Sequence, residues 1–186
     1  MKKGLVPAEK SFYSFYTPIG QICVAEDGKG ISDLFFGRRE KPAYAKEQPT
    51  PLLLKAETQL QEYFNGERKA FELPLSLHGT PFQVSVWEAL LTIPYGETRS
   101  YKQIAEQIGN PKACRAVGLG NNRNPVGIIV PCHRVIGSDG SLVGYGGGLP
   151  VKQYLLTLER KYLIPQDENR PDDPVESLDD LAKEIW

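Results

Sequence analysis

The chain has 186 residues, of which 40% are hydrophobic and 10% aromatic, a composition that can build the core of one ordinary domain or two small ones. The formal net charge is −1, but residues 165–186 hold eight acidic and two basic side chains, so residues 1–164 carry a net charge of +5. This modest basic excess is compatible with a polyanionic partner.

Targeting, disulfide and metal signals are not visible in the sequence. The segment after Met1 lacks the apolar region of a secretory signal, and no run is long enough to span a membrane, so we expect a cytoplasmic protein with no membrane partner. The three cysteines lie far apart and only two histidines are present, which favours neither a disulfide framework nor a metal site. We expect no cofactor.

The N-terminal part of the chain has the pattern of strands and turns. Aromatic and β-branched residues cluster in segments 12–16, 22–24 and 31–36, and glycine-containing turns separate these segments. We therefore predict a small antiparallel sheet. Residues 37–50 are charged and contain proline, which indicates a surface loop.

A helix is predicted next, followed by a further strand and a domain boundary. Thr50-Pro51 starts the helix, Asn65-Gly66 ends it, and four apolar residues between them have helical spacing: Leu53, Ala56, Leu60 and Phe64. Residues 71–77 are a candidate strand. Gly79-Thr80-Pro81 marks the boundary with a helical second half.

Three helices follow in succession. Thr80 and Ser100 each have a glutamine three residues later, the spacing of a capping box, and the first of these helices has one apolar face: Phe82, Val86, Trp87, Leu90 and Leu91. Gly109-Asn110-Pro111 combines a helix-ending glycine, an N-cap and a first-turn proline, so a helix at 101–108 turns into one at 111–121. This is a helix-turn-helix pattern, although many such hairpins bind nothing.

Cys132 is the strongest candidate for chemistry. A short apolar segment delivers its thiol beside His133 and Arg134, and a thiol is a strong nucleophile only as the thiolate that such neighbours stabilise. A buried cysteine that only fills space is the alternative. The glycine run at 144–148 lets backbone amides approach a ligand, or else serves as a connector, and a final helix follows with apolar residues at Val151, Leu155, Leu158 and Tyr162.

Several segments between residues 82 and 160 resemble the O6-alkylguanine-DNA alkyltransferase family in order and spacing. They are Tyr101, Arg115-Ala116-Val117-Gly118, Asn124-Pro125, Pro131-Cys132-His133-Arg134-Val135, and Gly144-Tyr145 leading to Glu159. The resemblance implies an α+β fold, with an RNase-H-like N-terminal domain at 1–80 that holds the small antiparallel sheet and a helix. It also implies a helical, winged-helix-like domain with the helix-turn-helix at 81–164, and residues 165–186 remain as an acidic tail.

The resemblance also implies a reaction and a role for each site residue. Cys132 would take an alkyl group from O6 of guanine, or from O4 of thymine, in one irreversible turnover. His133 would remove the thiol proton through a water, Glu159 would support His133, Tyr101 would donate to the departing base, and Asn124 would tie the turn that carries Cys132. Base contacts would come from Val135, Tyr145 and Gly146.

DNA binding is implied by the same resemblance. The partner would be double-stranded DNA containing O6-alkylguanine, bound by a monomer that flips the damaged nucleotide out of the stack. Arg115 would fill the vacated position, and a side of small residues would let its helix enter the minor groove. This side comprises Ala113, Ala116 and Gly120, the last at a position where the family more often has alanine.

Three alternatives remain at this point. Alkyltransferase-like proteins bind flipped lesions without repairing them, but they lack the cysteine. A thiol hydrolase could use Cys132 and His133, although adjacent catalytic residues are unusual for such enzymes. A transcription regulator is the role that a helix-turn-helix most often suggests, but base-edge readers are sparse here. For the tail, we predict a solvated segment with a short docking helix that uses Leu178, Leu181, Ile185 and Trp186.

Overall fold

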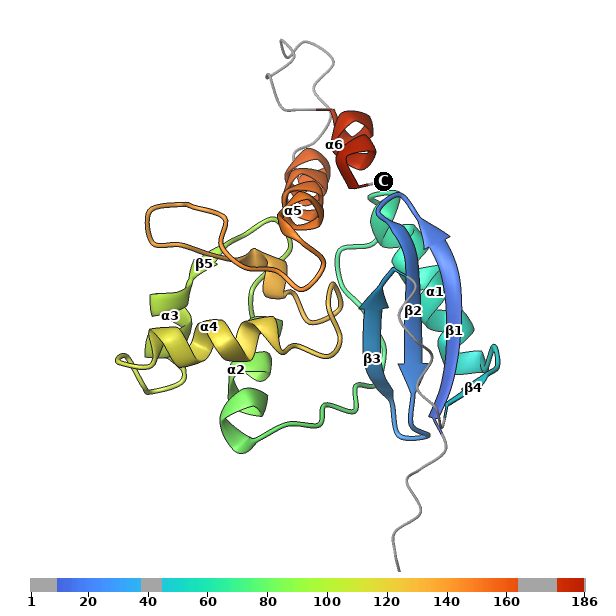
Figure 1. The fold of residues 1–186 in the computed structure, drawn as a ribbon, viewed down its shortest axis with the longest axis horizontal. Coiled ribbons are helices and arrows are strands. Elements are labelled where there is room, and N and C mark those ends of the chain that lie inside the picture. Colours follow the sequence, from blue (N-terminus) through green and yellow to red (C-terminus); the bar gives the residue numbers. More distant parts are fainter. Residues whose placement is uncertain (1–9, 38–44, 164–176, 186) are drawn as a thin grey trace, which may run out of the picture.

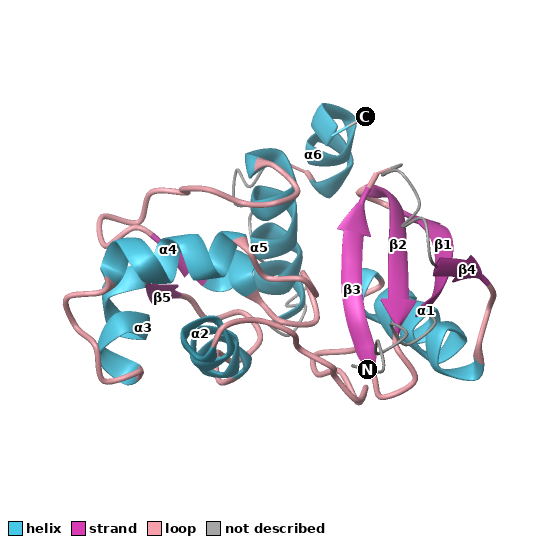
Figure 2. Cartoon of the chain, turned by 60° about the horizontal axis from the view of Figure 1, so that its bottom comes forward, coloured by secondary structure: helices cyan, strands magenta, loops and turns pink. Residues whose placement is uncertain are grey.

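The computed structural model describes residues 10–37, 45–163 and 177–185. A sheet covered by one helix lies on one side of the molecule, and a cluster of helices lies on the other (Figure 1). Helix α5 (Leu149–Leu163) stands between the two groups, and α6 (Leu178–Ile185) packs beside it (Figure 2). None of the described helices combines the length and the apolar character that crossing a membrane requires.

The N-terminal sheet has the strand order β3-β2-β1-β4. Its strands are β1 (Lys10–Thr17), β2 (Gly20–Glu26), β3 (Ile31–Phe36) and β4 (Ala45–Glu47). The first three strands are antiparallel, which confirms the prediction for them, whereas β4 is parallel to β1. The prediction of a loop over 37–50 is therefore wrong for the three residues of β4, and residues 38–44 lie outside the described part of the chain.

Helix α1 (Pro51–Phe64) has the bounds that the sequence predicted, and it covers the sheet. The Thr50 side chain accepts a hydrogen bond from the backbone N–H of Leu53, and Pro51 occupies the first turn, where its missing N–H costs nothing. Asn65 caps the other end, and Gly66 takes the positive φ that commonly follows a helix. The buried face of α1 includes Leu53, Ala56, Leu60, Tyr63 and Phe64.

The segment between α1 and the helical half is tied to the sheet without becoming a strand. The backbone N–H of Ile31 donates to Pro74, that of Ser76 donates to Ile31, and Leu75 forms a single parallel bridge with Ile31. The predicted strand at 71–77 is therefore wrong apart from this one bridge. Pro74 lacks the N–H that a longer ladder would need.

The helical half begins with α2 (Pro81–Leu91), then β5 (Arg99–Ser100), α3 (Tyr101–Gln107) and α4 (Cys114–Asn122). Both predicted capping boxes are present, at Thr80 with Gln83 and at Ser100 with Gln103. The apolar face of α2 is as predicted except for Leu91, which is 45% exposed.

Helix α4 starts three residues later than predicted. Pro111 and Lys112 form a turn, and Ala113 is the N-cap without a side-chain hydrogen bond. Gly109 does end the preceding turn with a positive φ. The Gly-Asn-Pro signal therefore located the turn correctly but not the first residue of the helix.

The final part of the chain runs from the cysteine segment to α6. A short 3-10 helix η1 (Cys132–Arg134) leads into β6 (Val135–Ile136), which pairs in parallel with β5. Helix α6 lies against α5, and its Leu181 is only 2% exposed, so part of the predicted tail is a docked helix. Trp186 and the predicted solvated segment at 165–176 lie outside the described residues.

Candidate active site

Cys132 is delivered by a loop that Asn124 closes. The Asn124 side chain donates from Nδ2 to the carbonyl of Val130 over 2.8 Å, and its Oδ1 accepts from the backbone N–H of Val126 over 3.0 Å. Within this loop Ile128 has a φ of 69°, a left-handed conformation that is costly for a β-branched residue. The loop is therefore held in one shape just before the nucleophile, as the role expected for Asn124 requires.

The Cys132 thiol is 5% exposed, and this burial raises its pKa to about 11. A hydrogen bond from the Asn124 side chain and the charge of Lys152 oppose this rise without cancelling it. The protonated thiol therefore predominates at neutral pH, and its proton must be removed before the sulfur can attack. Arg134 does not help, since its guanidinium binds Glu159 and the carbonyl of Ile93.

His133 and Glu159 form a fully buried pair. His133 Nε2 lies 2.8 Å from Glu159 Oε1, and because a carboxylate only accepts, Nε2 carries the proton. Burial lowers the pKa of His133 below its ordinary value, and Glu159 offsets this only in part. Nδ1 is buried and has no hydrogen-bond partner among the described residues. The ring can therefore accept a proton at Nδ1.

Four residues from three parts of the chain hold Glu159. Besides His133, its carboxylate accepts from Arg134 Nε and Nη2 over 2.9 Å each, from the Gly96 backbone over 2.9 Å, and from the Tyr63 hydroxyl over 2.8 Å. Burial alone would raise the pKa of Glu159, but His133 and Arg134 hold it well below its usual range. Glu159 is therefore ionised at neutral pH.

Lys152 is a site residue that sequence reasoning missed. Its side chain is fully buried, and Nζ donates to the carbonyl of Val135 over 2.6 Å and to that of Val143 over 2.9 Å. Burial lowers the pKa of Lys152 to about 8, and Cys132 opposes this. The one sequence signal for a role of Lys152 is its place on the otherwise apolar, buried face of α5, where a lysine is unusual. The Val135 carbonyl, expected to bind a base, already has this donor.

Two of the residues expected to contact a base, Tyr101 and Tyr145, lie near enough to Cys132 to interact with its charge. The Tyr101 hydroxyl donates to the carbonyl of Val143 over 2.9 Å, and the pKa of Tyr101 is raised by burial and by the nearby Cys132. The Tyr145 ring lies 6.5 Å from that of His133, and its hydroxyl is buried with no partner among the described residues. Gly146 is exposed in the following turn. The fold therefore brings Tyr101 and Tyr145 close to Cys132.

The small residues predicted to share one side of α4 differ in exposure: Ala116 is exposed, whereas Gly120 is buried. Arg115 and Ala116 are exposed, and Ala113 is half-buried at the N-cap. Gly120 is buried: its carbonyl accepts from Trp87 Nε1 over 2.9 Å, and an added Cβ would lie 3.4 Å from Val86. The expectation that Gly120 enters a DNA groove is therefore wrong, because this residue faces α2.

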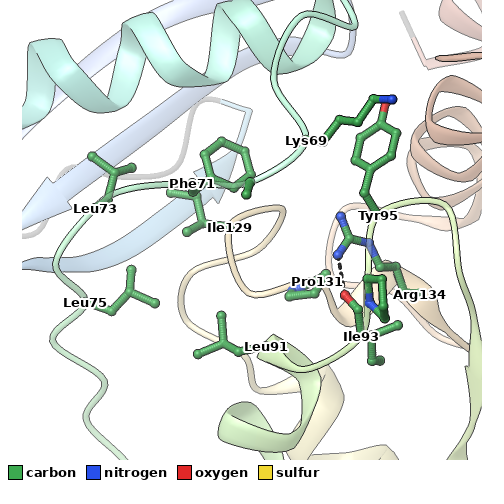
Figure 3. A pocket seen from close by; sticks show the side chains of 12 residues that line it. Lys69, Phe71, Leu73, Leu75, Leu91, Ile93, Tyr95, Ile129, Pro131 and Arg134 are labelled. Atoms are coloured by element: carbon green, nitrogen blue, oxygen red, sulfur yellow. Dashed lines mark hydrogen bonds between the residues drawn. The ribbon is translucent and has the colours of Figure 1, made fainter. Parts of the chain in front are cut away.

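A cavity of about 260 Å³ lies beside the cysteine segment, between residues 69–75 and the end of α2 (Figure 3). Pro131 and Arg134 form part of its wall, but Cys132 is not among the lining residues. Within the described residues, no group of three or more histidine, cysteine or acidic side chains is placed to hold a metal ion.

Comparisons with known proteins agree with this geometry. Residues 81–161 match the family model "6-O-methylguanine DNA methyltransferase, DNA binding domain", and residues 11–77 match the model of its ribonuclease-like domain. A methylated-DNA–protein-cysteine methyltransferase of Methanosarcina acetivorans is 51% identical over 148 residues, which cover 78% of this chain and 95% of the relative. A constitutive enzyme of the same name from Bacillus subtilis is 50% identical, with 77% and 92% covered.

A solved structure shows the same arrangement of the chain. The crystal structure of Mycobacterium tuberculosis OGT in complex with DNA superposes with a TM-score of 0.78 at 48% sequence identity. The match covers 82% of this chain and 94% of that one. The described α6 lies beyond the residues that either family model matches.

Proposed function

The chain belongs to the 6-O-methylguanine DNA methyltransferase family, and from this premise we propose that it repairs alkylated DNA directly, with Cys132 as the acceptor. It is a methylated-DNA–protein-cysteine methyltransferase that moves an alkyl group from O6 of guanine to sulfur. The observation that carries the assignment is the buried His133–Glu159 pair, because His133 directly follows Cys132 in the chain. Of the two cysteines in the matched DNA-binding domain, Cys132 is the buried one. Alkyl groups on O4 of thymine are a further expected substrate.

The reaction begins with the thiol proton, because Cys132 is protonated at rest. His133 Nδ1 takes this proton through a water, and Glu159 stabilises the positive charge that the ring acquires. The sulfur then attacks the alkyl carbon in line, an S–C bond forms, and the bond from that carbon to O6 breaks. A proton from the Tyr101 hydroxyl neutralises the departing guanine, and the proton gained by His133 balances the one that Tyr101 gives up.

Two features of the resting site support these roles. The Tyr101 hydroxyl donates to the Val143 carbonyl, so the donor is already oriented on the Cys132 side of the helix-turn-helix. Asn124 contributes a hydrogen bond to the sulfur, which favours the thiolate once the proton has left. Val135, Tyr145 and Gly146 are proposed to contact the base.

DNA binding is proposed to use the exposed side of α4. O6 of guanine is hidden in a duplex, so the nucleotide must leave the stack, which costs a few kcal/mol and less for a damaged base. Arg115 is exposed and would occupy the vacated place, with Ala116 beside it against the minor groove. Ala113, half-buried at the N-cap, is proposed to face the minor groove as well.

The proposed domains are an N-terminal domain at 1–80, a DNA-binding and acceptor domain at 81–164 and a C-terminal extension at 165–186. We expect the protein to act as a monomer on DNA in the cytoplasm, and light scattering of the complex with a short duplex measures its stoichiometry. Hydrolase and transcription-regulator functions are disfavoured by the family membership.

One experiment tests the proposed function. A thioether offers water no acyl or phosphoryl centre to attack, so each molecule should react once. Mass spectrometry after mixing with excess duplex that contains O6-methylguanine should show one added methyl group, located on Cys132, and no transfer to a Cys132→Ala variant. Repeated turnover, or methylation of Cys23 or Cys114, would contradict the assignment.

A further inference from the structure

The N-terminal domain reaches into the catalytic network through one side chain. Tyr63, in the last turn of α1, donates from its hydroxyl to Glu159 Oε1 over 2.8 Å, although the two residues are 96 positions apart in the chain. Both side chains have no exposed surface. A hydrogen bond to a buried carboxylate is stronger than one in water, so this contact affects the charge that it touches.

Tyr63 and His133 share the same carboxylate oxygen. His133 Nε2 and the Tyr63 hydroxyl both lie 2.8 Å from Glu159 Oε1, and Arg134 Nη2 lies 2.9 Å from it. A donor to Oε1 withdraws charge from the atom that attracts the His133 proton. The Tyr63 hydroxyl keeps its own proton, because burial first and Glu159 second raise its pKa well above the ordinary value.

We propose that Tyr63 is a positioning residue for alkyl transfer: its hydroxyl limits how strongly Glu159 attracts the His133 proton, so the N-terminal domain sets the strength of the base that activates Cys132. This inference rests on the function proposed above. Tyr63 does not touch the reacting atoms in this arrangement and acts through Glu159.

Several other charged and titratable groups surround His133 and Glu159, and replacing Tyr63 leaves them in place. Arg134 in η1 and Lys152 in α5 both lower the pKa of His133, and Glu159 raises it. Tyr145 packs edge-on against the His133 ring, and Tyr95 lies close enough for Glu159 to raise its pKa. Removing the Tyr63 hydroxyl should therefore let Glu159 raise the pKa of His133 further than it does in the native protein.

Tyr95 provides a matched control. Its ring packs against that of Tyr63 at 6.0 Å between centroids, and its hydroxyl is buried with no hydrogen-bond partner among the described residues. Tyr95→Phe therefore deletes the same atom from the same cluster without changing the donors to Glu159. Any effect of losing a buried hydroxyl in general should appear in both variants.

The test measures the single-turnover rate constant for methyl transfer from an O6-methylguanine duplex between pH 5 and 8.5. In Tyr63→Phe the midpoint of the pH profile should move to higher pH, with a rate about threefold to tenfold lower below the midpoint, as expected for one hydrogen bond to a charged group. Above the midpoint the variant should match the native protein. Tyr95→Phe should match it at every pH.

An equal loss of rate at all pH values, or a profile unchanged from that of the native protein, would overturn the inference. NMR titration of the His133 ring without DNA gives a second measurement, and its midpoint should rise in Tyr63→Phe. Site-specific 3-fluorotyrosine at position 63 keeps the ring and makes the hydroxyl a stronger donor. It should lower the midpoint of the rate profile and that of the His133 titration, and it provides a test if Tyr63→Phe does not fold. If the native protein transfers no methyl group, the proposed function fails, whereas the NMR titration still decides whether Tyr63 controls His133.

Discussion

The ammonium group of Lys152 donates a 2.6 Å hydrogen bond to the backbone carbonyl of Val135, directly after the segment that carries the nucleophile. The same group binds the carbonyl of Val143, which also accepts from the Tyr101 hydroxyl. One buried lysine thus joins α5, β6 and the loop that faces α3. Lys152 Nζ therefore helps to position both Tyr101, through the Val143 carbonyl, and the segment that follows Cys132, through the Val135 carbonyl.

Lys152→Met should remove this connection. The Val135 carbonyl would lose its Lys152 donor, whereas the Val143 carbonyl would keep the Tyr101 hydroxyl. A buried unpaired polar group costs about 1–3 kcal/mol, so the free energy of unfolding should fall by about that amount. Methyl transfer should also slow, because Tyr101 and Val135 lose a common anchor. Urea denaturation and single-turnover kinetics measure the two effects. Lys161→Met, at an exposed position of the same helix, should change the unfolding free energy by less than about 0.5 kcal/mol.

Stability should fall in acid through the His133–Glu159 pair. The pKa of His133 is lowered in the folded protein, so the unfolded chain takes up a proton first and stability declines as the pH falls through the ordinary value of 6.5. The pKa of Glu159 is also lowered, so its contribution is present above 4.5 and is lost as the pH falls further. Both contributions have the same sign.

Urea denaturation at several pH values checks this expectation. The unfolding free energy should decrease from pH 7 to pH 5 and decrease further below pH 4.5. NMR of the His133 ring should show a titration midpoint below the ordinary value of 6.5. A constant unfolding free energy between pH 7 and pH 5 would mean that His133 is not buried in its neutral form.

Arg115 should matter for duplex DNA and not for the chemistry itself. In Arg115→Ala no side chain fills the place that the extruded nucleotide leaves in the base stack. The rate constant on an O6-methylguanine duplex should therefore fall by about tenfold or more. The reaction with the free base O6-benzylguanine should keep its rate, because that substrate needs no extrusion. Cys114→Ser, at the neighbouring position of α4, should leave both rates unchanged. Equal losses on both substrates would point to a damaged fold.

Helix α6 should contribute to stability through Leu181. This side chain is 2% exposed against α5, and truncating a buried leucine to alanine costs about 2–5 kcal/mol, so Leu181→Ala should lower the unfolding free energy by about 2 kcal/mol or more. Leu54→Ala provides the control, because Leu54 is 43% exposed on α1. Thermal unfolding compares the two. Similar melting temperatures would show that α6 is not docked in solution.

Local signals in the sequence were enough to place most elements. The caps at Thr50, Thr80 and Ser100 depend on residues three positions apart, so the sequence contains all the information that forms them. The start of α4 could not be placed in this way, because Ala113 and not Asn110 becomes the N-cap. The predicted strand at 71–77 had suitable side chains, but tertiary pairing used only Leu75.

The sequence predicted the site residues that belong to a family motif. It did not predict the contacts that arise only when distant segments pack together. His133 and Glu159 form a hydrogen bond next to Cys132 in the sequence, whereas the pairing of Tyr63 with Glu159 joins residues 96 positions apart and leaves no local pattern. Gly120 looked suited to a DNA surface because it is small, but its small size serves contact with Val86. The protonation state of the thiol depends on burial, which no stretch of sequence encodes by itself.

The enclosure of the Cys132 sulfur has a consequence for the lifetime of the protein. Peroxide and other cellular oxidants attack exposed thiolates, and this sulfur is neither exposed nor ionised at neutral pH. An acceptor that can be used once is thereby preserved from accidental oxidation until a lesion reaches it.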